Sequence, residues 1–264
     1  ISGGTDVDLD AINTGTLTVS ADISGSGRIT LDSDGNFNQT TGTIQSTGST
    51  VAINTTSAGT ATLRDISANT TVTVIADGDL SQASGTITGT GVTLTSTTGN
   101  LIVGNVNSSG TVDLNAATAL KTIMQQIGTA IIGGGDLNTD SGAATTLDNA
   151  NLVATFVATT GTGNIRLTNG QTIILTNING GSVTPGSVRI DNTVGTLTLV
   201  ASSNVTDVTF IADALVLPGP ISVVGLVDLT STADLDLTLI DIQGANVTLT
   251  STTGNLVVGN INSS

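Results

Sequence analysis

The residues best suited to chemistry form a short acidic run, Asp32-Ser33-Asp34-Gly35-Asn36. Its oxygen-bearing side chains stand at positions one, three and five, as they do in EF-hand calcium loops. The pattern then departs from that motif, because Phe37 replaces the sixth-position glycine and Thr43 replaces the bidentate carboxylate at position twelve. Asp and Asn are also the residues that tight turns select. We expect a turn at Asp32, Asp34 and Asn36, with weakly bound Ca²⁺ as the alternative and no other cofactor.

Most side chains used in catalysis are missing from the chain. It has no His and no Cys, and all 20 acidic residues are Asp. These absences exclude Ser-His-Asp and thiol nucleophiles, soft-metal sites and Glu-based glycosidase pairs. A polysaccharide-degrading β-helix would need Asp clustered with Arg or Lys, usually beside aromatic residues, and the chain has no Trp and no Tyr. We expect no enzymatic activity and keep such an enzyme as a minor alternative.

The charge of the chain argues against anionic partners. Five basic residues face 20 acidic ones, which gives a net charge of −15. We therefore expect neither nucleic acid nor membrane insertion, and no apolar run reaches the roughly 18–20 residues that span a bilayer. Asp6 and Arg28 fall in equivalent slots of adjacent repeats, so we expect them to pair. Elsewhere beside the first strands, we expect neutral repeats to separate the carboxylates.

A repeat of about 20 residues positions these side chains. Alternating apolar pairs begin at Val7, Ile29, Val51, Val72 and Val92, at steps of 22, 22, 21 and 20 residues. Two further apolar sites follow in each unit, and Gly, Asn, Ser and Asp fill the joints between them. Three short strands per unit with polar corners describe one coil of a parallel β-solenoid. We predict an all-β fold of about 13 coils, in which stacking buries columns of aliphatic side chains.

A longer duplication overlies this repeat. Residues 92–109 recur at 247–264 with 16 of 18 positions identical, at an offset of 155 residues. Outward Thr-x-Thr pairs within such units also allow an ice-binding solenoid, although Ile75 and Asp113 interrupt the array. We interpret residues 1–264 as one solenoid segment of a larger repetitive protein.

The repeat is blurred over residues 115–187. Within it, residues 116–132 place Leu120, Ile123, Ile127 and Ile131 at spacings of 3, 4 and 4, which predicts an amphipathic helix. Such a helix would be an insertion or distorted coil that packs on the rod. Two alternatives remain, a lateral docking element for another molecule and strands throughout.

The motif Gly-Asn-Leu-Ile-Val-Gly-Asn-Val at 99–106, its copy at 254–261 and the Val-Thr-Leu-Thr strand before each resemble the shaft repeats of filamentous-haemagglutinin-like bacterial exoproteins. The resemblance covers most of the chain. It implies a right-handed parallel β-helix, export across the outer membrane, and a role as a stalk or adhesin. The chain has no Asn-Pro motif of the kind found in that family's secretion domain, so we expect it to be shaft.

The leading functional hypothesis is therefore an extracellular structural or adhesive rod at the bacterial cell surface. Neither end resembles a polar capping coil, so we expect the protein to continue beyond both ends or to stack end to end with further copies. The alternative is a binding module that recognises a host or neighbouring-cell ligand through residues 115–187.

Overall fold

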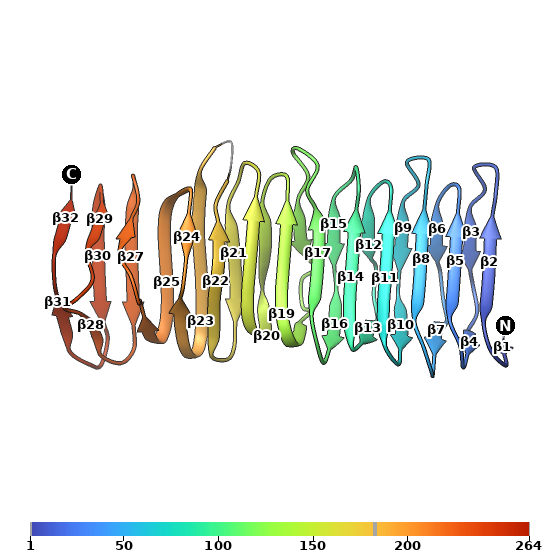
Figure 1. Cartoon of the computed structure of the whole chain (residues 1–264), viewed down its shortest axis with the longest axis horizontal. Coiled ribbons are helices and arrows are strands. Elements are labelled where there is room, and N and C mark those ends of the chain that lie inside the picture. The colour runs from blue at the N-terminus through green and yellow to red at the C-terminus, as the bar shows by residue number, and fades with distance from the viewer. Residues whose placement is uncertain (1, 182–183, 264) are drawn as a thin grey trace.

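Parallel strands stacked lap upon lap make up the molecule, as the computed structural model shows (Figure 1). The structure describes residues 2–181 and 184–263, and among these it contains strands and turns but no helix. About 13 laps form a rod with the two termini at opposite ends. The predicted parallel β-solenoid is confirmed.

Each of the first six laps consists of three short strands, which form three faces of the rod. The first face contains β2 (Val7–Ala11), β5 (Ile29–Ser33), β8 (Val51–Thr55), β11 (Thr71–Ala76), β14 (Gly91–Ser96) and β17 (Val112–Ala116). The second face contains β3 (Leu17–Val19), β6 (Phe37–Gln39), β9 (Ala61–Leu63), β12 (Leu80–Gln82), β15 (Leu101–Val103) and β18 (Ile123–Gln125). The third face contains β1 (Ser2–Gly3), β4 (Ile23–Gly25), β7 (Thr43–Ser46), β10 (Asp65–Ala68), β13 (Thr86–Gly89) and β16 (Asn105–Ser108).

Longer strands turn the corners of the middle laps, and short strands return at the C-terminal end. The middle strands are β19 (Ile131–Ser141), β20 (Thr145–Thr160), β21 (Ile165–Asn169), β22 (Ile173–Asn179), β23 (Gly186–Leu199), β24 (Ser202–Ser203) and β25 (Val205–Val216). The last strands are β26 (Ile221–Ser222), β27 (Leu226–Ser231), β28 (Leu235–Leu237), β29 (Ile242–Gly244), β30 (Asn246–Ser251), β31 (Leu256–Val258) and β32 (Ile261–Ser263).

The core is a set of columns in which register partners on successive laps point inward. Val51, Val72 and Val92 are consecutive partners on the first face, and all three are buried. A longer column follows the second face through the whole rod. Its members are Leu17, Phe37, Ala61, Leu80, Leu101, Ile123, Thr145, Ile165, Val188, Val208, Val227 and Val247. Like side chains stack at the lap spacing of about 4.8 Å, which explains the 20-residue beat of the sequence.

The same column shows that the duplication is turned around the rod axis. Val247 corresponds in sequence to Val92 of the first face, yet it lies in the column of Leu101 on the second face. An offset of 155 residues therefore equals seven laps plus the step from one face to the next. The two copies point in different directions, which the sequence repeat alone does not reveal.

Polar corners hold successive laps together. Buried hydroxyl groups of Ser33, Thr55 and Ser96 donate to corner carbonyl groups 2.6–2.8 Å away. Aspartates accept from a backbone N–H of the next lap, for example Asp65 Oδ1 from Thr86 and Asp79 Oδ1 from Asn100. Because a corner leaves N–H groups outside the strand ladder, Asp, Asn and Ser are needed there to satisfy them.

The helix predicted over residues 116–132 is wrong. Ile123 pairs with Leu101, and Ile131 pairs with Val106, so both side chains continue inward columns. A helix would leave β15 and β16 without partners on this side, and the ladder outweighs the local helical spacing. Leu120 and Ile127, the other two members of the expected apolar face, lie in turns and are exposed.

Candidate functional site

The proposed calcium ligands are engaged at corners of the rod. Asp34 Oδ2 accepts from the Asn13 N–H at 2.8 Å, and Asn36 Oδ1 accepts from the Thr60 N–H at 2.9 Å. Asp32 lies outward on β5, one lap from Asp10. Within the described part of the chain, no three acidic side chains lie close enough to hold a metal ion together. The turn-forming role is what these contacts support, and calcium binding stays a prediction.

The expectation that neutral repeats separate the carboxylates is wrong at this position. Asp10 and Asp32 are direct register partners on adjacent laps. Burial raises the pKa of the Asp32 carboxyl, and the charges of Asp10 and Asp8 raise it further. Asp10 and Asp32 are related by the same 22-residue step as Val7 and Ile29, so the spacing of the sequence already contained this contact.

The predicted pairing of Asp6 with Arg28 involves the backbone. The two residues occupy equivalent slots as expected, and Asp6 Oδ1 accepts from the Arg28 N–H at 2.8 Å. Among residues 2–181 and 184–263, the ion pairs are Arg166–Asp148 and Arg189–Asp191. The Asp6 carboxylate thus satisfies a corner amide, as Asp65 and Asp79 do.

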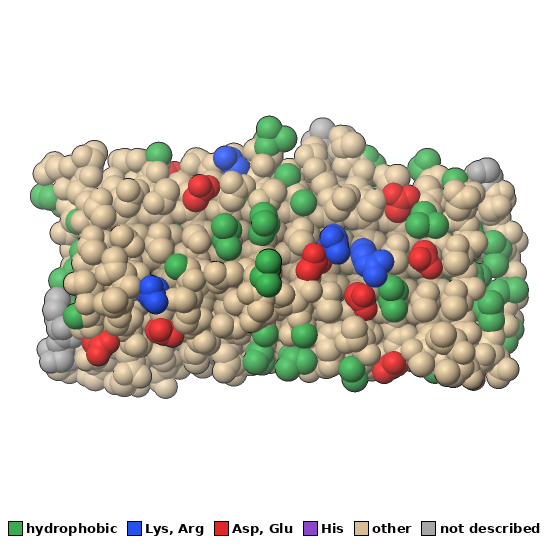
Figure 2. Space-filling view, turned by 180° about the vertical axis from the view of Figure 1, so that it is seen from behind, with side chains coloured by type: hydrophobic (Ala, Val, Ile, Leu, Met, Phe, Trp, Pro, Cys, Tyr) green, Lys and Arg blue, Asp and Glu red, His purple; other side chains and the backbone are tan. Residues whose placement is uncertain are grey.

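Two arginines lie side by side on the second face. Arg166 and Arg189 are register partners, and each lies 3.4 Å from a carboxylate oxygen, of Asp148 and Asp191 respectively. Figure 2 shows two basic side chains together on this side of the rod, with acidic side chains around them. Because these carboxylates offset the positive charge, the cluster does not form an anion site. Exposed pairs of this kind contribute about 0–1 kcal/mol.

An exposed apolar surface surrounds β18, within the segment for which the helix was predicted. Leu120 is 78% exposed, Met124 is 48% exposed and Ile127 is 94% exposed, and Met124 stacks outward on Ile102. We call these four residues the central patch. Apolar side chains are seen in the middle of the rod in Figure 2. Most other outward positions near it carry Thr, Asn or Ser, so this patch differs from the shaft around it.

A repeated loop that the sequence reading missed explains the position of Ile127. Gln-x-x-Gly occurs at Gln39, Gln82 and Gln125, at spacings of 43 residues, or two laps. The glycines have φ values of 78°, 77° and 79°, and Gln39 and Gln82 donate through Nε2 to the carbonyl of the loop glycine. The recurrence at 43 residues was the signal that could have found this loop. In the third loop, Ile127 stands where the first two have Thr41 and Ser84.

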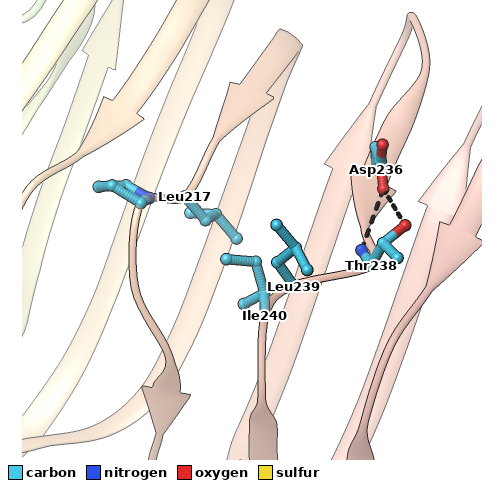
Figure 3. A pocket seen from close by; sticks show the side chains of 6 residues that line it. Leu217, Asp236, Thr238, Leu239 and Ile240 are labelled. Carbon is cyan, nitrogen blue, oxygen red and sulfur yellow. Dashed lines mark hydrogen bonds between the residues drawn. The ribbon is translucent and has the colours of Figure 1, made fainter.

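The stack of laps opens near the C-terminal end. Strands β28 and β31 form one separate small sheet, and β26, β29 and β32 form another. Among the described strands after β25, β27 and its partner β30 alone continue the main sheet, through the pairing of β27 with β25. A hollow of about 590 Å³ lies at the opening, lined by Leu217, Pro218, Asp236, Thr238, Leu239 and Ile240 (Figure 3).

Proline accounts for the opening. Pro218 corresponds to Leu63 in the first copy of the duplication, where β9 pairs with β12. Proline lacks the N–H that a ladder needs. The Thr238 N–H, whose counterpart Ala83 donates to Leu63 O in the first copy, donates within its own lap to Asp236 Oδ1 at 3.0 Å. The hydrogen bonds from the Thr238 hydroxyl and N–H lower the pKa of the Asp236 carboxyl.

Comparison of the chain with protein-family models, curated proteins and solved structures finds no match. No helix among the described residues is long and apolar enough to cross a membrane. The candidate sites are therefore argued from geometry alone.

Proposed function

We propose that this chain is the shaft of an extracellular structural or adhesive protein, and that its function is mechanical. The observation that carries the proposal is the continuous column from Leu17 to Val247, in which every lap is hydrogen-bonded in register to the next. A solenoid of this kind extends by about 4.8 Å per lap, so about 13 laps span roughly 60 Å. Length and surface display then follow from the number of laps, without a catalytic residue or a cofactor.

End-to-end stacking is part of this proposal, and the duplication supports it. In the shaft, Val112, Ile123 and Ile131 of the following laps cover Val92, Leu101 and Val106. Residues 247–264 repeat nearly the same side chains as 92–109. A lap with aliphatic residues in the same slots therefore fits on this edge, and Val7, Leu17 and Ile23 of a second copy provide them.

Electron microscopy of the purified chain at increasing concentration tests the proposal. We expect rods whose lengths are multiples of about 60 Å. Leu249→Lys combined with Leu256→Lys places charges on the stacking edge and should leave single rods of unchanged width. Compact globular particles would refute the proposal that the chain is a shaft. Rods of several times the single length that persist in the double variant would refute stacking through this edge.

The central patch favours a second candidate function, an adhesin that binds a ligand on a host or neighbouring cell. Leu120, Met124 and Ile127 of this patch expose large apolar side chains in one lap of the irregular segment 115–187, and Ile102 lies one lap below. Deleting the segment would remove part of the stack, because residues 116–135 contribute β18 and the start of β19. Surface point variants therefore separate binding from rod integrity better than a deletion does.

A further inference from the structure

We propose that the central patch docks a protein partner that presents apolar side chains between basic ones. This inference rests on the second candidate function and names the partner's chemistry. Leu120, Met124 and Ile127 belong to one lap and lie before, on and after β18. A lap that exposes three large apolar side chains has a surface suited to protein contact.

The backbone at Leu120 sets the direction of its side chain. Leu120 has φ = 67°, in the left-handed region, which a residue with a Cβ adopts at a steric cost. Its side chain is mostly exposed, so burial in the rod does not offset that cost. Thr14 and Ala58 adopt the same region of φ in turns of the first laps, so the left-handed turn belongs to the corners of the rod, and it is the large apolar side chain that distinguishes Leu120. This turn leaves the Leu120 side chain exposed in the same lap as Met124.

The Gln-x-x-Gly loops supply an internal comparison for Ile127. All three loops adopt the same glycine conformation, and two of them carry Thr41 or Ser84 at the matching position. The loop therefore folds with a polar residue there. Met124 can be compared with Ser81 in the same way. Ser81 pairs with Ile102 and Ile102 pairs with Met124, so Ser81 lies two laps below Met124 in the same outward column. Met124 and Ile127 are therefore apolar where the lap two turns below carries Ser81 and Ser84.

The charge distribution indicates which partner fits. Residues 1–79 carry nine Asp and two Arg, for a net charge of −7, and residues 136–264 carry ten Asp and two Arg, for −8. Between them, residues 80–135 carry only Asp113 and Lys121 and are neutral. A second copy lying alongside would bring like-charged flanks together. A partner with basic residues on both sides of its apolar contact would be attracted by the flanks of the rod.

Three synthetic peptides test this inference with the intact chain. One has a Leu/Phe core between lysines, one has the same core between glutamates, and one has a Ser core between lysines. We expect the first to bind at least tenfold more tightly than the other two, and its binding to weaken as salt is added. The double variant Met124→Ser with Ile127→Ser, which introduces the residues found at 81 and 84, should reduce that binding at least tenfold.

The controls are Ile75→Ser and Val224→Ser, which remove exposed apolar side chains outside the central patch. Both should bind the first peptide as the wild type does. Equal binding of the glutamate-flanked peptide, or binding unchanged in the double variant, would overturn the inference. Dimerisation in sedimentation that the double variant abolishes would overturn it in favour of a second copy. Rod length in electron micrographs, measured on the same samples, reports separately on the shaft.

Discussion

Asp10 and Asp32 stand directly one above the other on adjacent laps, as register partners in β2 and β5. Two like charges at one lap spacing repel each other, and Asp32 is also partly removed from water. Burial, followed by the charges of Asp10 and Asp8, raises the pKa of Asp32. On the other side, Asp32 faces the neutral Asn54.

Asp32→Asn should therefore stabilise the protein at neutral pH by about 0.2–1 kcal/mol, the range for a cross-strand pair. A raised pKa means that the folded state disfavours the carboxylate, so this unfavourable contribution is present at pH 7. It shrinks as the pH falls through the raised folded pKa and is absent below the ordinary value of 3.8, where the group is protonated in both states.

Denaturant unfolding of the wild type and Asp32→Asn at several pH values measures the difference. The stability gap should close on acidification, and it should also narrow in high salt at pH 7. Asp22→Asn serves as the control, because the Asp22 carboxylate accepts from the Thr43 N–H and an asparagine oxygen can accept the same bond. A gap that is independent of pH would contradict the charge explanation.

Gln82 is a buried cross-lap connector whose loss should be costly. Its Oε1 accepts from the Gly104 N–H at 2.9 Å, and its Nε2 donates to Asn105 O at 2.8 Å and to Gly85 O at 3.2 Å. Gln82→Ala leaves these buried backbone groups unsatisfied, at about 1–3 kcal/mol each. We expect a loss of about 3 kcal/mol or more in unfolding free energy, measured by denaturant titration.

Gln82→Leu is the informative comparison, because Leu237 occupies this position in the second copy of the duplication. Leucine keeps most of the volume but cannot bond the three backbone groups, so the loss should be smaller than that of Gln82→Ala and still clear. Ser81→Ala, at the outward neighbour, should change little. Wild-type stability of Gln82→Leu would show that the hydrogen bonds contribute nothing net.

The sequence predicts the columns well because the solenoid imposes the same requirement on each lap. Val51, Val72 and Val92 must all be inward and aliphatic, so a 20-residue beat is visible without any structure. The beat fails where laps differ in length. Ile123 and Ile131 look helical in isolation, and only their partners Leu101 and Val106 make them strands.

The surface features were less predictable, for a different physical reason. The 22-residue step from Val7 to Ile29 also relates Asp10 to Asp32, so their contact was visible in principle, whereas the burial of Asp32 was not. The exposure of Ile127 depends on its place in a Gln-x-x-Gly loop, since a sequence pattern treats an isoleucine as core by default. The opening at Pro218 was visible in principle, because proline stands where the first copy has Leu63.

The laps beyond the opening should unfold locally before the rest of the rod. Of their three faces, only one is joined to the main sheet, through β25 and β27. Fewer ladder hydrogen bonds lower the free energy of local opening. Hydrogen exchange should therefore be faster for amides in β28, which has β31 on one side and no strand partner among the described residues on the other, than for those in β12 and β13, which pair on both sides.

Pro218→Leu restores the residue of the first copy and should slow exchange in β28. Pro185→Leu is the matched control, since it removes a proline outside the opening. Because the chain contains no Cys, spin labels at Ser203→Cys with Gln243→Cys can also report the distance across the opening. A label pair at Gln45→Cys with Thr88→Cys spans regular laps on the third face. Equally narrow distance distributions for the two label pairs would contradict local unfolding at the opening.

The strained turn at Leu120 gives the last prediction. Leu120→Gly should raise the unfolding free energy, because glycine adopts φ = 67° without the steric cost that leucine has. The gain is about 1 kcal/mol or less, since glycine also gains freedom in the unfolded chain. Leu120→Ala keeps a Cβ and should give no gain, so the pair isolates the backbone term from loss of the exposed side chain. Thermal unfolding of the three proteins measures the effect. A glycine variant no more stable than the alanine variant would contradict a steric cost of the left-handed backbone at Leu120.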